Sequence, residues 1–277
     1  MNATAFAPGN VSGVFKIVRD DDPRRMHSLG MGFTVAHGVT ATVRDAPVTE
    51  IAFNGKVFDF ATVRSVAEAL SSRPVRIELE SELPLSGGFG LSGASALATA
   101  YALDTGFELG LDERALGMTA HVAEVTNLTG LGDVCGQFRG GCLAKLVPGD
   151  PLAAIALPVA EQTVYWRYFS PIMTREIIGD PGHAARINAA ADSALADIGK
   201  LADRGVTVFG EYIASARRFA IESGLLSHPD VRRIIADVEA AGGAASMIML
   251  GNAVFSTIAF EGARETRLAR QRAGVVE

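Results

Sequence analysis

The most constraining feature of the chain is a segment of small residues, Pro84 to Ala96, which reads PLSGGFGLSGASA. Its four glycines and three serines run directly into an alanine-rich stretch, 94–103, that predicts a helix. Glycine allows a backbone to approach an anion closely, because it has no Cβ. The N-terminus of a helix adds free N–H groups and partial positive charge. The segment therefore predicts a phosphate-binding loop. The alternative is a connection that only begins a buried helix.

Two common phosphate-binding patterns do not account for this segment. A Walker A loop requires a lysine, and no lysine lies between Arg73 and Arg114. The glycines have the spacing of part of a dinucleotide fingerprint, but the loop lies in mid-chain after the predicted strand 75–82. That strand alternates acidic with apolar residues, unlike the buried strands of a parallel nucleotide-binding sheet. A nicotinamide-dependent enzyme is therefore disfavoured.

The segment resembles the central motif of the GHMP kinases, in which a proline and three further residues precede Gly-Leu-Gly-Ser-Ser-Ala-Ala. Ser92 aligns with the second serine, which in the family helps to hold magnesium, whereas Leu91 replaces the first. Ser95 is a nearby hydroxyl that could take the same role. The resemblance implies that ATP is bound by the residues Pro84, Ser86, Gly87, Gly88, Phe89, Gly90, Leu91, Ser92, Gly93, Ala94 and Ser95.

Further segments support the resemblance from residue 5 to about residue 255. Ala7 to Asn10 resembles the opening Ala-Pro-Gly-Arg/Lys of the family, with Asn10 in place of the basic residue. Gly130 to Asp133, with paired glycines that begin seven residues beyond the acid, resembles a motif of the mevalonate kinases. The third family motif, a glycine-rich loop, is only faintly visible around 242–246.

Within the family, the strings at 90–96, 120–125, 129–134 and 246–252 look like those of the pantoate kinases, archaeal enzymes of coenzyme A synthesis. This resemblance implies phosphorylation of the 4-hydroxyl of (R)-pantoate by ATP. One alternative is a GHMP kinase for another small hydroxy acid or alcohol, such as mevalonate, shikimate or homoserine. Another is a catalytically inactive binding protein on the same scaffold. Homoserine kinases lack an aspartate at the position of Asp133, and mevalonate-type enzymes normally have a basic residue at that of Asn10.

The resemblance also implies roles for individual side chains. Asp133 would accept the proton of the substrate hydroxyl, and Glu124 would hold Mg²⁺ together with Ser92. Taken without the resemblance, Glu124 is an ordinary surface glutamate and Asp133 is the cap of the next helix. The candidates for binding the acceptor are Ser28, His121, Lys145 and Arg139. The alternative for His121 is a histidine whose hydrogen bonds are satisfied within the core. Lys145 is favoured over Arg139 as the partner of the carboxylate, and Lys16 is a further candidate.

The expected elements suggest an α+β fold, and the resemblance implies the GHMP kinase architecture. A two-layer α/β N-terminal half, residues 1–150, would pack against a ferredoxin-like α+β C-terminal half, residues 151–277. Asn54-Gly55 predicts a tight hairpin turn. The charged C-terminal segment is expected to form a helix.

Bulk properties exclude several classes of protein. The net charge of −6 provides no basic surface for nucleic acid. No apolar run reaches the ~20 residues of a membrane span, and no secretory signal is visible, so we expect a cytoplasmic protein. Cys135 and Cys142 are expected to be reduced, partly buried thiols rather than a disulfide or zinc ligands. A homodimer is plausible from the family.

Overall fold

The computed structural model describes residues 2–172, 177 and 181–276. Its elements, in chain order, are β1 (Asn2–Val18), β2 (His27–Asp45), β3 (Glu50–Phe53), β4 (Lys56–Val57), α1 (Ala61–Leu70), β5 (Val75–Glu80), α2 (Leu91–Phe107), α3 (Glu113–Thr126), α4 (Asp133–Arg139), β6 (Cys142–Lys145), β7 (Ile155–Ala156), β8 (Gln162–Pro171), α6 (Pro181–Asp203), α7 (Phe209–Glu222), α8 (Pro229–Ala240), β9 (Ala245–Ile248), β10 (Gly251–Ser256), β11 (Arg264–Leu268) and β12 (Gly274–Val275).

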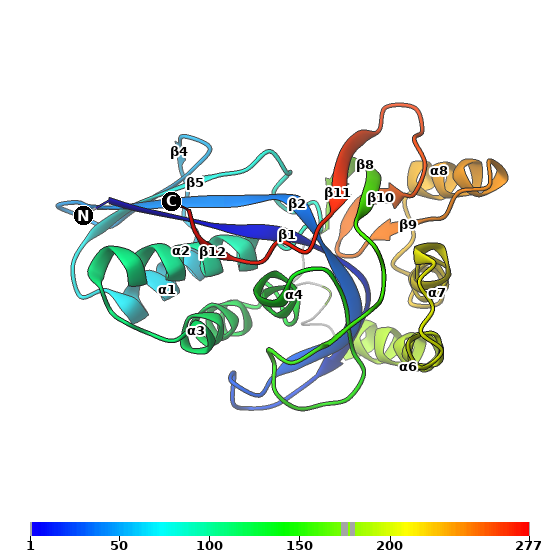
Figure 1. Cartoon of the computed structure of the whole chain (residues 1–277), viewed down its shortest axis with the longest axis horizontal. Helices are drawn as coiled ribbons and strands as arrows, with labels where there is room; N and C mark the ends of the chain where they lie inside the picture. Colours follow the sequence, from blue (N-terminus) through cyan, green and yellow to red (C-terminus); the bar gives the residue numbers. More distant parts are fainter. Residues whose placement is uncertain (1, 173–176, 178–180, 277) are drawn as a thin grey trace.

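Two long antiparallel strands, β1 and β2, form the centre of the fold. They pair along almost their whole length, with register shifts after Pro8 and after Ser12. Such bulges bend a strand, and both strands curve from the N-terminal half into the other half of the molecule (Figure 1). On the far side of β2, the sheet continues through β5, β6 and β11, and it contains twelve strands in the described part of the chain.

The N-terminal half is a sheet covered on one face by helices. Strands β3 and β4 form the expected hairpin, with Asn54 at φ 48° and Gly55 at φ 74°. The connection from β3 through α1 leads to β5, which lies parallel to β3 and antiparallel to β2. Helices α1, α2 and α3 lie together on one side of these strands (Figure 1).

Helix α2 is buried around almost its whole circumference from Leu91 to Leu103. Its apolar residues are not confined to one stripe, which is typical of a helix in the interior of a domain. The alanines, glycine and serines of this stretch are small enough to let β1, β2, α1 and α3 pack closely around it. The helix that follows the loop is therefore a fixed element of the core.

The C-terminal half combines β8, β9, β10 and β11 with the helices α6, α7 and α8. These helices lie at the opposite end of the molecule from α1 to α3 (Figure 1). The mixed α+β architecture predicted from the sequence is confirmed. None of the described helices is both long enough and apolar enough to cross a membrane.

The prediction of a C-terminal helix is wrong. The charged segment forms β11, in which Thr266 and Leu268 are buried while Arg267 between them is exposed. This alternation fits a strand that pairs with β8 and meets β2 at Val35. Backbone hydrogen bonds to the neighbouring strands stabilise the extended conformation more than the helix propensity of the segment stabilises a helix. The chain then returns to the N-terminal half, where β12 pairs with β1 (Figure 1).

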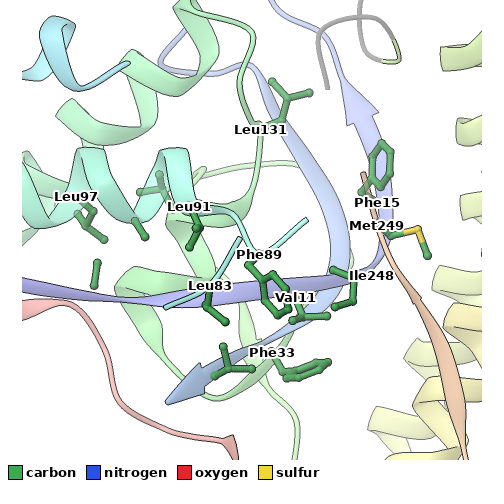
Figure 2. Packing of buried hydrophobic residues seen from close by; sticks show 14 of the residues in the cluster. Val11, Phe15, Phe33, Leu83, Phe89, Leu91, Leu97, Leu131, Ile248 and Met249 are labelled. Atoms are coloured by element: carbon green, nitrogen blue, oxygen red, sulfur yellow. The ribbon is translucent and has the colours of Figure 1, made fainter. Parts of the chain in front are cut away.

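The loop that precedes α2 is anchored in the core by Phe89. Figure 2 shows its ring among the side chains of Leu83, Val11 and Phe33. The ring also meets Trp166 of β8 edge-on, with the centroids 4.9 Å apart. Because Phe89 is buried among these side chains, the loop is held to both halves of the molecule.

Candidate active site

The loop has the backbone geometry that its glycines predicted. Gly88 has φ 83° and Gly90 has φ 61°, and Ser86 adopts a positive φ of 59°. A Cβ on Gly88 would lie 2.5 Å from the carbonyl oxygen of Met249, so the turn between β9 and β10 fits tightly against the loop. Helix α2 begins at Leu91, and Gly90 caps it without a side chain. The first N–H groups of α2 therefore have no side-chain cap from Gly90.

The loop forms one wall of a cavity of about 370 Å³. Six of the predicted ATP-binding residues line it, namely Ser86, Gly88, Phe89, Gly90, Leu91 and Ser92. The other five, Pro84, Gly87, Gly93, Ala94 and Ser95, do not line it. Ser95 is fully buried in α2, whereas Ser92 borders the cavity. Of the two hydroxyls that the sequence left open, Ser92 is therefore the one that can reach a ligand.

Two carboxylates converge beside the start of α2. Glu124 comes from the end of α3, and Asp133 is the first residue of α4. A Cβ on Gly130 would overlap Oε2 of Glu124 and would lie 3.4 Å from Oδ2 of Asp133. A Cβ on Gly90 would lie 2.8 Å from Cγ of Asp133. Glycines thus provide the space in which both acids approach the loop.

Asp133 is held by hydrogen bonds from β1. Its Oδ1 accepts one from Nδ2 of Asn10 at 2.8 Å and one from Oγ of Ser12 at 3.3 Å. Burial raises the pKa of Asp133, and these two donors oppose the shift. The interpretation of Asp133 as a helix cap is wrong, because α4 begins without a side-chain cap and Asp133 is its first helical residue. Its second oxygen, Oδ2, lies on the side of Gly130.

Glu124 is buried, with 1% of its surface exposed, so it is not a surface glutamate. Its Oε1 accepts a hydrogen bond from Oγ1 of Thr129 at 2.6 Å, while its Oε2 has no hydrogen-bond partner. Burial, followed by the charge of Asp133, raises the pKa of Glu124 to about 7, against the hydroxyls of Thr129 and Ser92. A buried carboxylate oxygen without a partner is rare. It fits a site for a cation.

The donor set suits magnesium. Mg²⁺ prefers oxygen ligands and keeps several of its waters, so one or two protein ligands suffice. Glu124 and the Ser92 hydroxyl offer such oxygens at the start of α2. Among the described residues, no cluster of three or more His, Cys, Asp or Glu side chains could hold a metal ion by itself. Water and ligand oxygens would have to complete the coordination.

A second, smaller cavity of about 50 Å³ adjoins the first. The two share Ser12, Phe15, Ser28 and Gly132 in their walls, and Lys145 borders only the smaller one. The ammonium group of Lys145 donates to the carbonyl oxygen of Asp150. Burial lowers the pKa of Lys145. The predicted acceptor residues Ser28 and Lys145 are thus brought together here.

His121 and Arg139, the other two predicted acceptor residues, line neither cavity. His121 is buried, and its Nε2–H donates to the carbonyl oxygen of Met26 at 3.0 Å. Burial lowers its pKa to about 4, so the ring stays neutral. Arg139 is exposed and borders a separate surface cavity with Arg272. The structure thus places both side chains outside the two cavities, and their contact with the acceptor stays a prediction. Lys16, the further candidate, forms an ion pair with Asp192 instead.

Several residues of the site were missed in the sequence. Asn10 was noted only as a departure from a family pattern, and Ser12 and Thr129 gave no signal beyond being polar. Gln137 of α4 donates to the carbonyl oxygen of Gly90 at 2.7 Å and so ties α4 to the loop. The contact of the C-terminal half with the cavity comes from Ile172, Met249 and Leu250, not from 242–246.

The chain is similar to proteins of known family. Residues 59–141 match the GHMP kinases N terminal domain. The pantoate kinase of Methanospirillum hungatei is 28% identical over 265 residues, which cover 91% of this chain and 86% of that protein. The pantoate kinase of Methanocaldococcus jannaschii is 29% identical over 255 residues, or 90% of each. The chain thus contains a GHMP kinase N-terminal domain and is similar to pantoate kinases over most of its length.

Solved structures agree with this similarity over the full length of the chain. A phosphotransferase related to the CoA biosynthesis pathway matches with a TM-score of 0.86 and 25% identity, covering 100% of this chain and 99% of that one. Mevalonate-3-kinase of Thermoplasma acidophilum matches with a TM-score of 0.70 at 14% identity, covering 100% and 98%, and so shares the fold. The family and fold predicted from the motifs are confirmed.

Proposed function

We propose that this GHMP kinase transfers the γ-phosphoryl group of ATP to the 4-hydroxyl of (R)-pantoate. The observation that carries the proposal is the arrangement around Asp133. This carboxylate lies where a large cavity, walled by the loop, meets a small cavity that ends at a lysine. A phosphate donor and a small acidic acceptor would then meet at one base. The similarity to pantoate kinases over most of the chain supports the same acceptor.

The large cavity would take the nucleotide. Backbone N–H groups of the loop and of the first turn of α2 would hold the phosphates. The cavity also has apolar walls, including Phe58, Leu85 and Leu128, that suit the nucleoside. Mg²⁺ held by Glu124 and Ser92 would neutralise charge on the phosphate oxygens when bound. Because the protein is acidic overall, positive potential has to be concentrated locally in this way.

The small cavity would take the acceptor. Lys145 would pair with the carboxylate of pantoate, and Ser28 would offer a hydroxyl beside it. The 4-hydroxyl would then lie near Oδ2 of Asp133, which accepts its proton as the oxygen attacks the γ-phosphorus. A primary alcohol is a very weak acid, so a base with a raised pKa is suited to this step.

A coupled assay of ADP release tests the acceptor. Purified protein with Mg-ATP is expected to release ADP with (R)-pantoate and not with mevalonate, shikimate or homoserine. Release with one of the other three instead would identify a different GHMP kinase. Release with none of the four would favour a binding protein on this scaffold.

Asp133→Asn tests the base. The amide keeps the size of the side chain and its bonds to β1 but cannot accept the proton, so we expect kcat to fall by about 10²-fold or more. ATP affinity should change little, because the loop is untouched. ATP binding can be followed by the fluorescence of Trp166, the single tryptophan, which contacts Phe89 of the loop. Equal turnover by mutant and wild type would contradict the role of Asp133.

A further inference from the structure

The small cavity is lined by polar and apolar residues that follow one another across the three neighbouring strands β1, β2 and β6. Strand β2 lies between β1 and β6, and its Gly32 is paired with Ser12 on one side and with Leu143 on the other. In the adjacent row, Gly30 is paired with Phe15 and with Lys145. The middle position of each row is a glycine, so no side chain rises between the outer strands.

The row that contains Leu143 begins at the proposed base. Ser12 donates to Oδ1 of Asp133, and Leu143 lies two strands away, about 10 Å across the sheet. Lys145 is two residues beyond Leu143 on β6, so both side chains emerge on the same face. A molecule that reaches from Asp133 to Lys145 therefore passes Leu143. All these residues except Asp133 line the small cavity.

The walls between the two polar ends are apolar. Val14, Met31, Leu143 and Ala154 border this cavity, and Val14 and Leu143 are themselves buried. The volume of about 50 Å³ has room for only a few water-sized groups, at about 10–15 Å³ for each water. The space suits a short chain with a compact apolar branch, a hydroxyl at one end and a carboxylate at the other.

We propose that Leu143 recognises the geminal dimethyl group of the acceptor and so sets specificity for a branched hydroxy acid. This inference rests on the proposed function and extends it. Lys145 and Asp133 select only the two ends, which many hydroxy acids share. The methyl groups distinguish pantoate from its unbranched analogue, and apolar contact is the interaction that can detect them. A buried methylene is worth roughly 10- to 200-fold in kcat/KM.

The experiment compares two acceptors in each variant. They are (R)-pantoate and (R)-2,4-dihydroxybutanoate, which is the same acid without the two methyl groups. The readout is the ratio of their kcat/KM values, in which the amount of folded enzyme cancels. Leu143→Ala removes the apolar wall, and Leu143→Val is a milder change in case the first variant folds poorly. Leu109→Ala, at an exposed leucine outside both cavities, is the matched control.

Wild type and Leu109→Ala are expected to prefer pantoate at least about tenfold. In Leu143→Ala the ratio should fall several-fold toward unity, with a smaller fall in Leu143→Val. The inference is overturned if wild type uses both acids equally, or if both Leu143 variants keep the wild-type ratio. Those results would leave the proposed function standing, because ADP would still be released with pantoate. Absence of release with either acid in wild type would overturn both proposals.

Discussion

Asn10 occupies the position at which the resemblance to the family leads one to expect a basic residue. Its amide donates to Asp133 without bringing a positive charge beside the carboxylate. Its backbone N–H donates to the carbonyl oxygen of Phe89 at 2.9 Å, so the same residue contacts the loop and the proposed base. A Cβ on Gly136 would overlap its Oδ1, so α4 also fits closely around it. We infer that Asn10 aligns Asp133 with the loop.

Asn10→Ala should lower kcat by about tenfold or more, because Asp133 loses a hydrogen bond to a charged group worth about 1.5–3 kcal/mol. The KM for ATP should change much less, since the backbone bond to Phe89 remains. Steady-state kinetics separate the two constants. Asn188→Ala is a matched control, because Asn188 bonds the backbone of Ile17 on the same strand, and Ile17 lines neither cavity. Similar losses of kcat in both variants would contradict a specific role for Asn10.

His121 makes the stability of the protein depend on pH. Burial lowers its pKa from 6.5 to about 4, so the folded state binds a proton less readily than the unfolded chain. Its stabilising contribution is present above pH 6.5 and is lost as the pH falls toward 4. The shift corresponds to a contribution of about 3 kcal/mol from His121 to the free energy of unfolding.

Urea denaturation between pH 7 and pH 4 measures this dependence. His121→Gln keeps a donor for the carbonyl of Met26 but does not titrate, so its free energy of unfolding should fall less steeply with acid. His27 is also buried and its pKa is lowered, so part of the slope should remain. An unchanged slope in His121→Gln would argue against this account.

At the scale of elements, the junction between the loop and α2 depends on Gly90. Its φ of 61° favours glycine, and a Cβ there would lie 2.8 Å from Cγ of Asp133. Gly110, in the connection between α2 and α3, has a similar φ of 68° but open space around its Cβ position. A side chain at Gly110 would therefore introduce backbone strain alone, whereas a side chain at Gly90 would introduce the same strain and also press on the carboxylate of Asp133.

Gly90→Ala and Gly110→Ala should each destabilise the protein by about 1 kcal/mol through the left-handed backbone. Only Gly90→Ala should also displace Asp133 and reduce kcat by about tenfold or more, because misplaced catalytic groups lose rate steeply. Thermal melting and turnover, measured on both variants, test this difference. Full activity in Gly90→Ala would show that the carboxylate tolerates the displacement.

At the scale of the whole molecule, one sheet joins the two halves. The division into residues 1–150 and 151–277 remains our proposal for how the chain is organised. The strands β11 and β12 nevertheless return to pair with β2 and β1. Separating the halves would break these pairs and expose Leu268, which is fully buried. We therefore expect the two halves to unfold together. A homodimer stays a prediction.

Urea unfolding should give one transition with the same midpoint by Trp166 fluorescence and by far-UV circular dichroism. Trp166 lies in β8 and contacts Phe89 of the N-terminal half, so its fluorescence reports the contact between the halves, whereas the dichroism reports the whole chain. Leu268→Ala should lower both midpoints equally, through a loss of about 2–5 kcal/mol. Two separate transitions would indicate halves that are stable independently.

Local patterns were sufficient for much of the fold. The glycines of the loop predicted its positive φ angles, Asn54-Gly55 predicted a hairpin, and the alanine-rich stretch 94–103 predicted α2. These features depend on interactions within a few residues. The segment 264–268 was misjudged because its strand exists only through partners on β8 and β2. Helix α4 was missed because it has only seven residues, with little room for a periodic signal.

By itself, the sequence determined the glycine-rich loop, the resemblance to the GHMP kinases and the two candidate acids, because these are recorded as residue types at fixed spacings. Only the tertiary structure decided which side chains meet. It brought Asn10 to Asp133, separated by 123 positions in the chain, left one oxygen of Glu124 without a hydrogen-bond partner, and placed His121 and Arg139 outside both cavities. The physical reason is that contacts, burial and pKa shifts arise between segments remote in sequence, which no local pattern encodes.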